Sequence, residues 1–364
     1  MRAAPRFVAG SRARARAAGP PPGTAVAAAT NGVLLINPRS GGGRAERVGL
    51  ARECRTRGVD PVVLAPGEDP VALAEAAVAR GTDVLGMAGG DGSLALVAGV
   101  AARHGVAMVV VPAGTRNHLA MDLGLDRGDV LGALDAFDPA MERMVDLGDV
   151  NGRPFVNNVS LGLYARIVRS PEYREAKIDT TLSMLPQLLG PGSRPFDLRF
   201  TGPAGERHSG AHVVQVSNNS YGRTLRTVVS RPRLDAGRLG VVTLLLPEGP
   251  TDRTFLAALA ARRPERFPGY AAWEPSTFEV DSGDLIDVGI DGEAVRMAPP
   301  LRFVIRPGAM RIRLPRHASG LSPAALEERR WTHLRETTRP PIPGGPSRRK
   351  VLLRSPARGG RRDG

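Results

Sequence analysis

The sequence predicts an α/β domain built on a parallel sheet, followed by a mostly antiparallel β-sandwich domain. Between residues 31 and 141, apolar strand-like runs alternate with helix-like runs, the pattern of a parallel sheet covered on both faces. From residue 142 to residue 315, short apolar runs separated by turn residues dominate, which favours antiparallel strands. A length of 364 residues is sufficient for two hydrophobic cores.

Four strand–helix pairs fill the first segment. The expected strands are 33–36, 61–64, 83–87 and 106–111, and the expected helices are 44–57, 70–80, 94–104 and 126–137. In sheets of this kind, ligands bind beyond the carboxyl ends of the strands. Polar and glycine-rich motifs at those ends are therefore the first place to look for a site.

The second segment contains six expected strands and two expected helices. The strands are 155–161, 212–217, 241–246, 278–280, 285–290 and 301–305, and the helices are 183–189 and 251–261. The Ala-, Arg-, Gly- and Pro-rich residues 1–30 and the basic residues 316–364 are expected to be disordered tails. One short helix is expected in the second tail, at 323–334.

The net charge of +14 is concentrated in the two tails. Residues 1–30 carry five arginines and no acid, and residues 316–364 carry a net charge of +8, so the tails supply thirteen of the fourteen charges. A neutral body with basic ends does not indicate a nucleic-acid partner. The tails are either solvated extensions or a means of peripheral contact with an anionic membrane.

Cys54 is the single cysteine, so no intrachain disulfide is possible, which suits a reducing cytoplasm. The N-terminus has arginines but no apolar core of a signal peptide, and no stretch approaches the length of a membrane span. We therefore expect a cytoplasmic protein, with peripheral contact at the inner membrane face as a further option.

The first motif, Asn37-Pro38-Arg39-Ser40-Gly41-Gly42-Gly43, stands between the first strand and the first helix. Successive glycine amides at a helix N-terminus bind anions readily. A flexible turn that binds no ligand could have the same sequence. The motif is neither a Walker loop nor a dinucleotide fingerprint, because both of those glycine patterns are absent.

The second motif, Gly89-Gly90-Asp91-Gly92-Ser93, follows the third strand and precedes the third helix. Its glycines allow a phosphate to approach the backbone closely, and Asp91 places a carboxylate where a metal or a hydroxyl group could meet it. Asp-Gly is also a common turn, so the flanking strand and helix give the motif its weight.

Two further motifs complete the set. Residues 112–118, Pro-Ala-Gly-Thr-Arg-Asn-His, follow the fourth strand, and Arg116 is either a phosphate ligand or a surface residue. Asp291-Gly292-Glu293 follows an apolar strand of the second domain. It is either a hairpin turn or, if the two domains meet, a carboxylate opposite Asp91.

In this order and spacing, the four motifs resemble the bacterial diacylglycerol kinase and sphingosine kinase-like lipid kinase family. The resemblance runs from about residue 31 to residue 314 and includes 145–148, 155–158 and 231–239. It implies a phosphofructokinase-like α/β domain, a β-sandwich domain, and ATP with Mg²⁺ between them. It also implies transfer of the γ-phosphoryl group to a lipid hydroxyl at a membrane surface.

The resemblance also implies roles for individual residues. Asp91 and Glu293 would be catalytic, with Glu293 as the general base, and Asp91 and Asp146 would take part in magnesium binding. The nucleotide would be bound by Asn37, Pro38, Arg39, Ser40, Gly41, Gly89, Gly90, Asp91, Gly92, Ser93, Gly114, Thr115, Asn117 and Arg174.

The chain departs from the family pattern at several positions. Ala95 and Leu96 stand where the family has Asn and Glu, and His118 stands where it has Asp. Ala65 replaces a Thr, and Ala236 occupies the position of a structural-metal Asp. These changes leave open a family member that binds nucleotide or lipid with little or no turnover. A kinase with another acceptor, such as a sphingoid base or NAD, is a further alternative.

Overall fold

The computed structural model describes residues 23–163, 165, 194–222, 230–246, 266–267 and 269–337, with side chains up to 332. The described residues up to Glu328 belong to one compact unit, and those from Arg329 onward belong to a second. None of the helices in the described part of the chain has the length and apolar character needed to cross a membrane.

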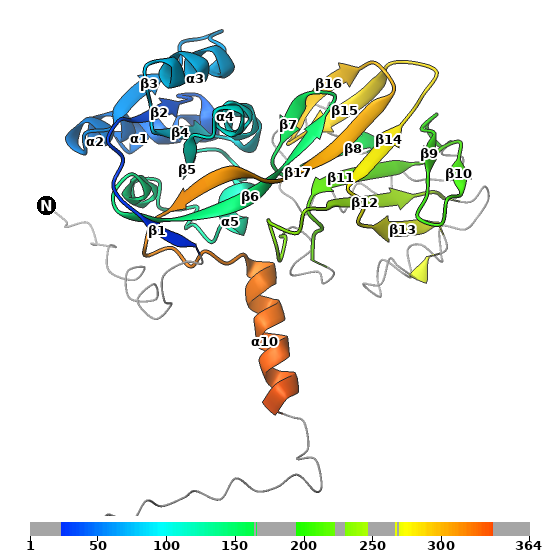
Figure 1. The fold of residues 1–364 in the computed structure, drawn as a ribbon. Coiled ribbons are helices and arrows are strands. Elements are labelled where there is room, and N and C mark those ends of the chain that lie inside the picture. The colour runs from blue at the N-terminus through cyan, green and yellow to red at the C-terminus, as the bar shows by residue number, and fades with distance from the viewer. Residues whose placement is uncertain are drawn as a thin grey trace, which may run out of the picture. The chain divides into compact units, whose positions relative to one another are not determined.

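The first unit contains a large mixed sheet (Figure 1) whose strands run in the order β1-β6-β17-β5-β4-β2-β3, with β7 added to β6 and β14 added to β17. Its strands are β1 (Thr24–Val26), β2 (Gly32–Ile36), β3 (Asp60–Val63), β4 (Val84–Gly89), β5 (Ala107–Pro112), β6 (Ala140–Val150), β7 (Arg153–Phe155), β14 (Thr277–Val280) and β17 (Leu301–Leu314).

Strands β2, β3, β4 and β5 are parallel to one another. Every residue of β2, β4 and β5 is buried, as expected for strands whose two faces are both covered. The flanking helices are α1 (Arg44–Arg47), α2 (Leu50–Thr56), α3 (Pro70–Ala79) and α4 (Asp91–His104). This part of the fold confirms the α/β prediction.

Two predicted helices differ from the structure. The helix expected at 44–57 is divided into α1 and α2, because Gly49 adopts a left-handed conformation with φ of 65°. The helix expected at 126–137 is reduced to the 3₁₀ helix η3 (Gly132–Ala136). Asp126 and Asp129 accept bonds from the amides of Gly128 and Gly132, and such local side-chain bonds compete with helix formation.

The last strand, β17, connects the two parts of the fold. Its C-terminal residues pair in parallel with β5, with Arg311 opposite Ala107. Residues 303–306 and 310–314 pair antiparallel with β6, on either side of a bulge. The predicted domain boundary at residue 141 lies inside β6, so the two parts share long strands. Residues 24–26, which the composition assigned to a disordered tail, form β1 on β6.

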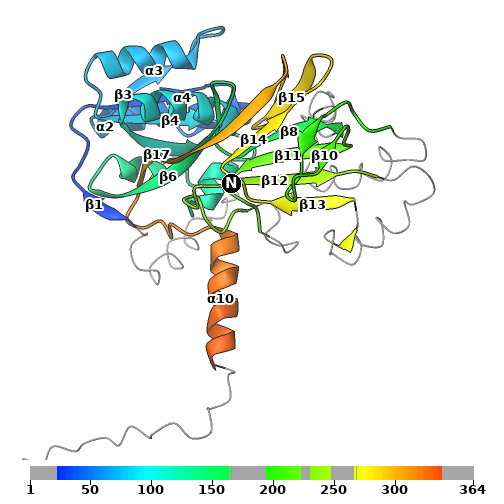
Figure 2. The same ribbon diagram turned by 45° about the vertical axis from the view of Figure 1, so that its right-hand side comes forward.

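The second sheet is antiparallel, in the order β13-β12-β11-β8-β15-β16, and Figure 2 shows it beside the long strands. Its strands are β8 (Asn158–Gly162), β11 (Val213–Asn218), β12 (Leu239–Leu244), β13 (Tyr270–Trp273), β15 (Ile286–Ile290) and β16 (Glu293–Met297). A shared apolar cluster fills the space between it and the far halves of β6 and β17. The β-sandwich prediction is therefore confirmed.

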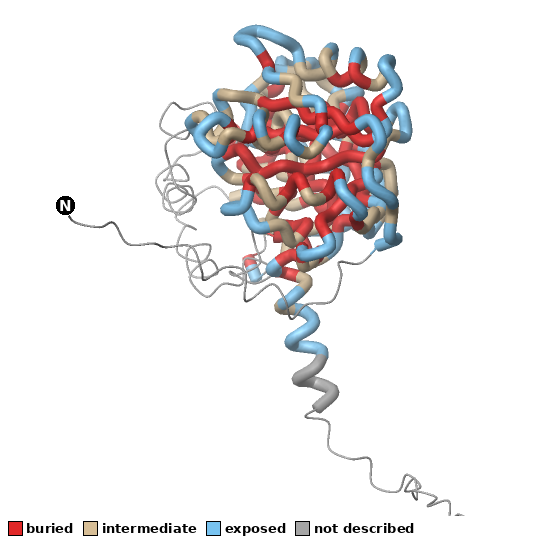
Figure 3. The backbone as a smooth tube through the Cα atoms, turned by 90° about the vertical axis from the view of Figure 1, so that its left-hand side faces the viewer, coloured by how far each residue is buried: buried red, intermediate tan, exposed pale blue. Residues whose placement is uncertain are grey.

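Buried residues follow the strands of the compact unit (Figure 3). The short β9 (Phe200–Thr201) and β10 (Arg207–His208) form a separate hairpin.

The helix α5 (His118–Asp122) begins at the last residue of the third motif and was not predicted. The helix expected at 323–334 is present as α10 (Pro323–Thr337). The helices expected at 183–189 and 251–261 lie outside the described residues.

A buried ion pair joins α5 to the sandwich. The Arg231 Nε lies 2.7 Å from Asp122 Oδ2, and both side chains are completely buried. The Arg231 Nη1 donates to the carbonyl oxygens of Val156 and Asn218, at 2.5 and 2.8 Å, and its Nη2 donates to Asn157 Oδ1 at 2.8 Å. Each of the three guanidinium nitrogens thus donates to at least one protein acceptor.

Removing one partner of this pair leaves a buried charge without compensation. We expect Arg231→Met or Asp122→Asn to lower the free energy of unfolding by about 3–5 kcal/mol, measured by urea denaturation. The control is Arg296→Met, which breaks the exposed Arg296–Asp287 pair and should change stability by less than about 1 kcal/mol. Equal effects of the buried and exposed changes would contradict this assignment.

Candidate active site

The first three motifs meet at the carboxyl edge of β2, β4 and β5. A Cβ atom at Gly41 would overlap the carbonyl oxygen of Ala113, and one at Gly114 would lie 2.5 Å from Gly90 Cα. The three loops approach so closely that side chains at these positions would separate them. The structure therefore brings together the motifs that the sequence placed at the ends of three strands.

The side chains of the first two motifs also meet. Asn37 Nδ2 donates to Ser93 Oγ at 3.5 Å, while Asn37 Oδ1 accepts a bond from the Arg39 amide. Gly90 has open space where a Cβ would stand, and its position before α4 leaves the amides of the first turn of that helix facing outward. Such a cradle of glycines at a helix N-terminus fits a phosphate group.

The outer members of the predicted nucleotide set frame this cradle. Pro38, Ser40 and Gly41 are partly exposed, and Arg39 and Thr115 are exposed, so all five are accessible to a ligand. The basic Arg47 donates to the carbonyl oxygens of Gly41 and Gly42 and so stabilises the loop. Arg174 lies outside the described residues.

Asn117 stabilises the third loop from within. Its Oδ1 accepts a bond from the Gly114 amide at 2.9 Å, and its Nδ2 donates to the Gly114 carbonyl oxygen at 2.8 Å. The residue is buried and has a left-handed φ of 52°. The side-chain amide of Asn117 therefore shapes the loop, and its direct contact with a nucleotide stays a prediction.

Asp91 is the first residue of α4 and is buried. Its carboxylate accepts bonds from the amides of His118 and Leu119, at 3.0 and 3.2 Å. These amides begin α5, so Asp91 caps that helix. The carboxylate thereby fixes the third motif against the second, and each oxygen retains one lone pair for a ligand.

The fourth motif reaches this edge from the sandwich. A Cβ atom at Gly92 would overlap the carboxylate of Glu293, so the Glu293 side chain lies directly on the first turn of α4. Arg153, from β7, donates to Glu293 Oε2 at 3.3 Å. The predicted base and the predicted phosphate loop are therefore in contact, although they are two hundred positions apart in the chain.

Asp291 shapes the turn that carries Glu293. Its carboxylate accepts three backbone bonds, from Val156 at 2.8 Å, Asn157 at 2.8 Å and Asn158 at 3.0 Å. Burial raises the pKa of Asp291 to about 7, and the nearby negative charge of Asp91 adds to this rise. The hydrogen bonds from the three backbone amides oppose it. Asp91 and Asp291 therefore bring two carboxylates to one region of the site.

Asp146 does not share the surroundings of Asp91. Its carboxylate oxygens accept bonds from the amides of Gly308 and Gly237, at 2.8 and 2.6 Å, and so tie a bulge in β17 to a loop of the sandwich. Within the described ranges, no three His, Cys, Asp or Glu residues form a group able to hold a metal ion. Magnesium binding by Asp91 and Asp146 stays a prediction.

Two participants, Arg153 and Asp122, were not found from the sequence, because their partners are distant in the chain. A basic residue at the start of a strand and an acid at the end of a helix are ordinary patterns. Asp291 belonged to the fourth motif, but its bonds to residues 156–158 could not be predicted from that turn.

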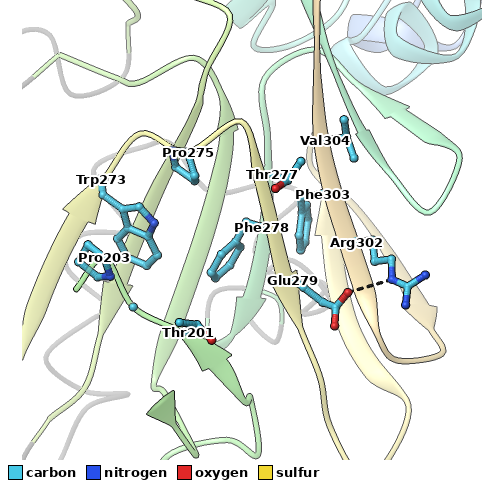
Figure 4. A pocket seen from close by; sticks show the side chains of 11 residues that line it. Thr201, Pro203, Trp273, Pro275, Thr277, Phe278, Glu279, Arg302, Phe303 and Val304 are labelled. Atoms are coloured by element: carbon cyan, nitrogen blue, oxygen red, sulfur yellow. Dashed lines mark hydrogen bonds and ion pairs between the residues drawn. The ribbon is translucent and has the colours of Figure 1, made fainter. Parts of the chain in front are cut away.

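A separate cavity of about 500 Å³ lies at the opposite edge of the sandwich (Figure 4). The ion pair Arg153–Glu293 joins β7 to β16 at one edge, whereas Trp273 of β13 meets Phe278 of β14 at the other, with ring centroids 5.5 Å apart. The cavity is lined by Trp273, Phe278, Phe303 and two prolines, and Glu279 and Arg302 form an ion pair at its side. It is not part of the site formed by the four motifs.

Comparisons with known proteins agree with this geometry. Residues 31–150 match the diacylglycerol kinase catalytic domain family. A protein from Pseudomonas aeruginosa named "Probable lipid kinase YegS-like" is 28% identical over 296 residues, which cover 78% of this chain and 94% of that protein. A diacylglycerol kinase from Bacillus subtilis is 44% identical over 48 residues, 13% of this chain and 16% of that one.

The fold has close counterparts among solved structures. A crystal structure of a diacylglycerol kinase from Bacillus anthracis superimposes with a TM-score of 0.60 at 16% identity, covering 79% of this chain and 97% of that one. A second structure from the same organism gives a TM-score of 0.61 at 17% identity, with the same coverage. The resemblance to this family is confirmed.

The buried Asp291 predicts a pH dependence of stability. Because its pKa in the folded protein is about 7 and that of an unfolded Asp is about 4, the folded state holds the proton more tightly. The contribution of Asp291 to stability is thus fully present at low pH and is lost as pH rises through about 4 to 7. Urea denaturation between pH 4 and pH 8 should show this loss in the wild type and a shallower one in Asp291→Asn. Parallel curves would contradict it.

Proposed function

We propose that this chain transfers the γ-phosphoryl group of ATP to the hydroxyl group of a lipid such as a diacylglycerol or a sphingoid base, because residues 31–150 match the diacylglycerol kinase catalytic domain family. The contact of Glu293 with Gly92 is the observation that carries the proposal. It puts a carboxylate from the sandwich beside the helix N-terminus at which the glycine loops meet.

In this proposal the three loops bind the nucleotide. The glycine amides and the first turn of α4 hold the phosphate oxygens, with Asn37, Ser40 and Ser93 as side-chain donors. The open space at Gly90 leaves room for a phosphate group, and the exposed Thr115 lies at the edge of the proposed site. The side chains of Asp91 and Asn117 accept hydrogen bonds from backbone amides, and these bonds hold the loops in this arrangement before a ligand binds.

Glu293 accepts the proton of the attacking hydroxyl in the proposed reaction. The O–H bond of the acceptor breaks as its oxygen bonds to the γ-phosphorus, the bond from that phosphorus to the β-phosphate bridging oxygen breaks, and ADP leaves. Positioning and charge neutralisation supply most of the catalysis in phosphoryl transfer, and a carboxylate is a suitable base for an alcohol.

The proposal also includes Mg²⁺, in a form that does not require a protein-made metal site. Mg²⁺ is typically held by substrate phosphates, water and one or two carboxylates, and when bound it neutralises phosphate charge. Each oxygen of Asp91 accepts one backbone amide hydrogen bond and retains a lone pair next to the glycine loops. Asp146 accepts as many, but from Gly237 and Gly308, which are not part of the four motifs. We therefore propose Asp91 as the carboxylate for a metal that enters with ATP.

We also propose that the protein acts at the inner face of the cytoplasmic membrane, since a lipid acceptor requires access to a bilayer. The net positive charge of residues 316–364 suits an anionic lipid surface. Cosedimentation with vesicles of phosphatidylglycerol, but not of phosphatidylcholine, tests this part of the proposal.

A second candidate function is nucleotide binding without turnover. Ala95 is packed in the hydrophobic core at 2% exposure, and its methyl group can make no polar contact with a nucleotide. His118 provides no carboxylate beside Asp91. Thermal stabilisation by Mg-ATP in a protein that labels no lipid would favour this candidate.

The main test is phosphorylation of mixed lipids by the purified protein with labelled ATP. Glu293→Gln should lower kcat by about 10²–10⁴-fold, because the base is lost, while the Kd for ATP stays unchanged. The matched control is Glu279→Gln, which alters an exposed carboxylate at the far edge of the sandwich. Full turnover in Glu293→Gln would overturn the role of Glu293.

A second test places a methyl group between the loop and the base. Gly92→Ala should displace the Glu293 carboxylate and lower kcat by about 10²-fold, since a displacement of about 1 Å costs that much. Alanine favours a helix by about 1 kcal/mol over glycine, so the melting temperature should not fall. In the double variant with Glu293→Gln, Gly92→Ala should have no additional effect; an independent, multiplying loss would argue against the contact.

A further inference from the structure

We propose that Arg153 is a positioning residue for the reaction: it holds the carboxylate of Glu293 at the place where the acceptor hydroxyl gives up its proton. This inference rests on the proposed function and assigns to it a residue from the sandwich. The contact that suggests it is the 3.3 Å distance between Arg153 Nη2 and Glu293 Oε2.

The two oxygens of Glu293 have different surroundings. Oε2 faces Arg153, and Oε1 lies over Gly92 at the start of α4. The Glu293 side chain is half exposed and begins a hairpin strand, where a glutamate without a partner would sample several rotamers. Arg153 therefore selects the rotamer in which Oε1 faces the phosphate loop.

Arg153 is itself held in a fixed position relative to α4. Its strand pairs with β6, with Arg153 opposite Val150, and the turn before it is closed by the Gly152 amide, which donates to Asp149 Oδ1 at 2.7 Å. The next residue, Pro154, packs so closely on α4 that a Cβ at Gly99 would lie 2.7 Å from Pro154 Cγ. The same helix thus supports both the residue that positions the base and the loop on which the base lies.

The local charges give Arg153 a second reason to be present. Asp91 and Asp291 add two carboxylates to this part of the site, but both are directed to backbone amides, of His118 and Leu119 in one case and of residues 156–158 in the other. Arg153 is the cation that the structure pairs with Glu293. It offsets negative charge where a phosphate group must approach.

Stability alone does not explain this pair. Both side chains are substantially exposed, Arg153 by 33% and Glu293 by 50%, and ion pairs of that kind contribute about 0–1 kcal/mol. If Arg153 were a plain surface residue, its removal would change neither stability nor turnover. A positioning residue changes turnover while the fold remains intact.

The experiment compares Arg153→Met, Arg153→Lys and Arg296→Met in the lipid-labelling assay. Arg153→Met should lower kcat by about 10-fold or more, with the KM for ATP and the melting temperature nearly unchanged. Arg153→Lys should recover most of the loss, because a single-donor contact can be made by an ammonium group. Arg296→Met removes an exposed pair with Asp287 on the same hairpin and should leave kcat at the wild-type value.

The double variant Arg153→Met/Glu293→Gln distinguishes positioning from direct contact with phosphate. If Arg153 acts through Glu293, its loss has no further effect once the base is absent. An equal, multiplying loss in that background would overturn the inference, as would wild-type kcat in Arg153→Met. A wild type that labels no lipid would instead remove the proposed function, and this inference with it.

Discussion

The buried pair of Asp122 and Arg231 is the interaction on which the arrangement of the site depends. Asp122 ends α5, whose first amides bond Asp91. Arg231 holds the backbone carbonyl of Val156 and the side chain of Asn157, and the amides of that same segment hold Asp291. A continuous series of polar contacts therefore connects the carboxylate of the second motif to the turn of the fourth. Each step is buried or partly buried, so each bond is exchanged with water only at a substantial cost.

The glycines have a complementary role at the same edge. Arg231 and Asp122 set the direction of α5 and of the sandwich loops. The glycines allow the loops of the motifs to come into contact. Gly41 lies against Ala113, Gly114 against Gly90, and Gly92 against Glu293. A Cβ at any of these positions would separate two of the motifs, so the spacing of the site is set by backbone contact and not by flexible side chains.

The sequence was sufficient for the α/β strands and the glycine loops because both depend on local patterns. Apolar runs of the right length and glycines at strand ends can be read without knowing the partner. The division at Gly49 and the loss of the helix at 126–137 were missed, because left-handed glycines and Asp side chains that bond nearby amides override a helical pattern. The five-residue α5 was missed because its first amides bond Asp91, which is distant in the chain. The backbone hydrogen bonds of Asn117 and Asp146 were not predicted either, and the assignment of these residues to a nucleotide and to magnesium stays a prediction. Pairings such as Arg153 with Glu293 depend on the register of β7 against β6 and on the packing of Pro154, which no local pattern encodes.

The position of β17 has a consequence for how the protein is made. Residues 311–313 are the neighbours of β5 in the first sheet, yet they are synthesised about two hundred residues after it. While the chain emerges from the ribosome, β5 presents an open edge of unpaired amides and carbonyls. The α/β half cannot close its sheet until the sandwich segment has been translated. Its folding is therefore expected to await nearly the whole chain, and a fragment ending at residue 150 would lack a central strand.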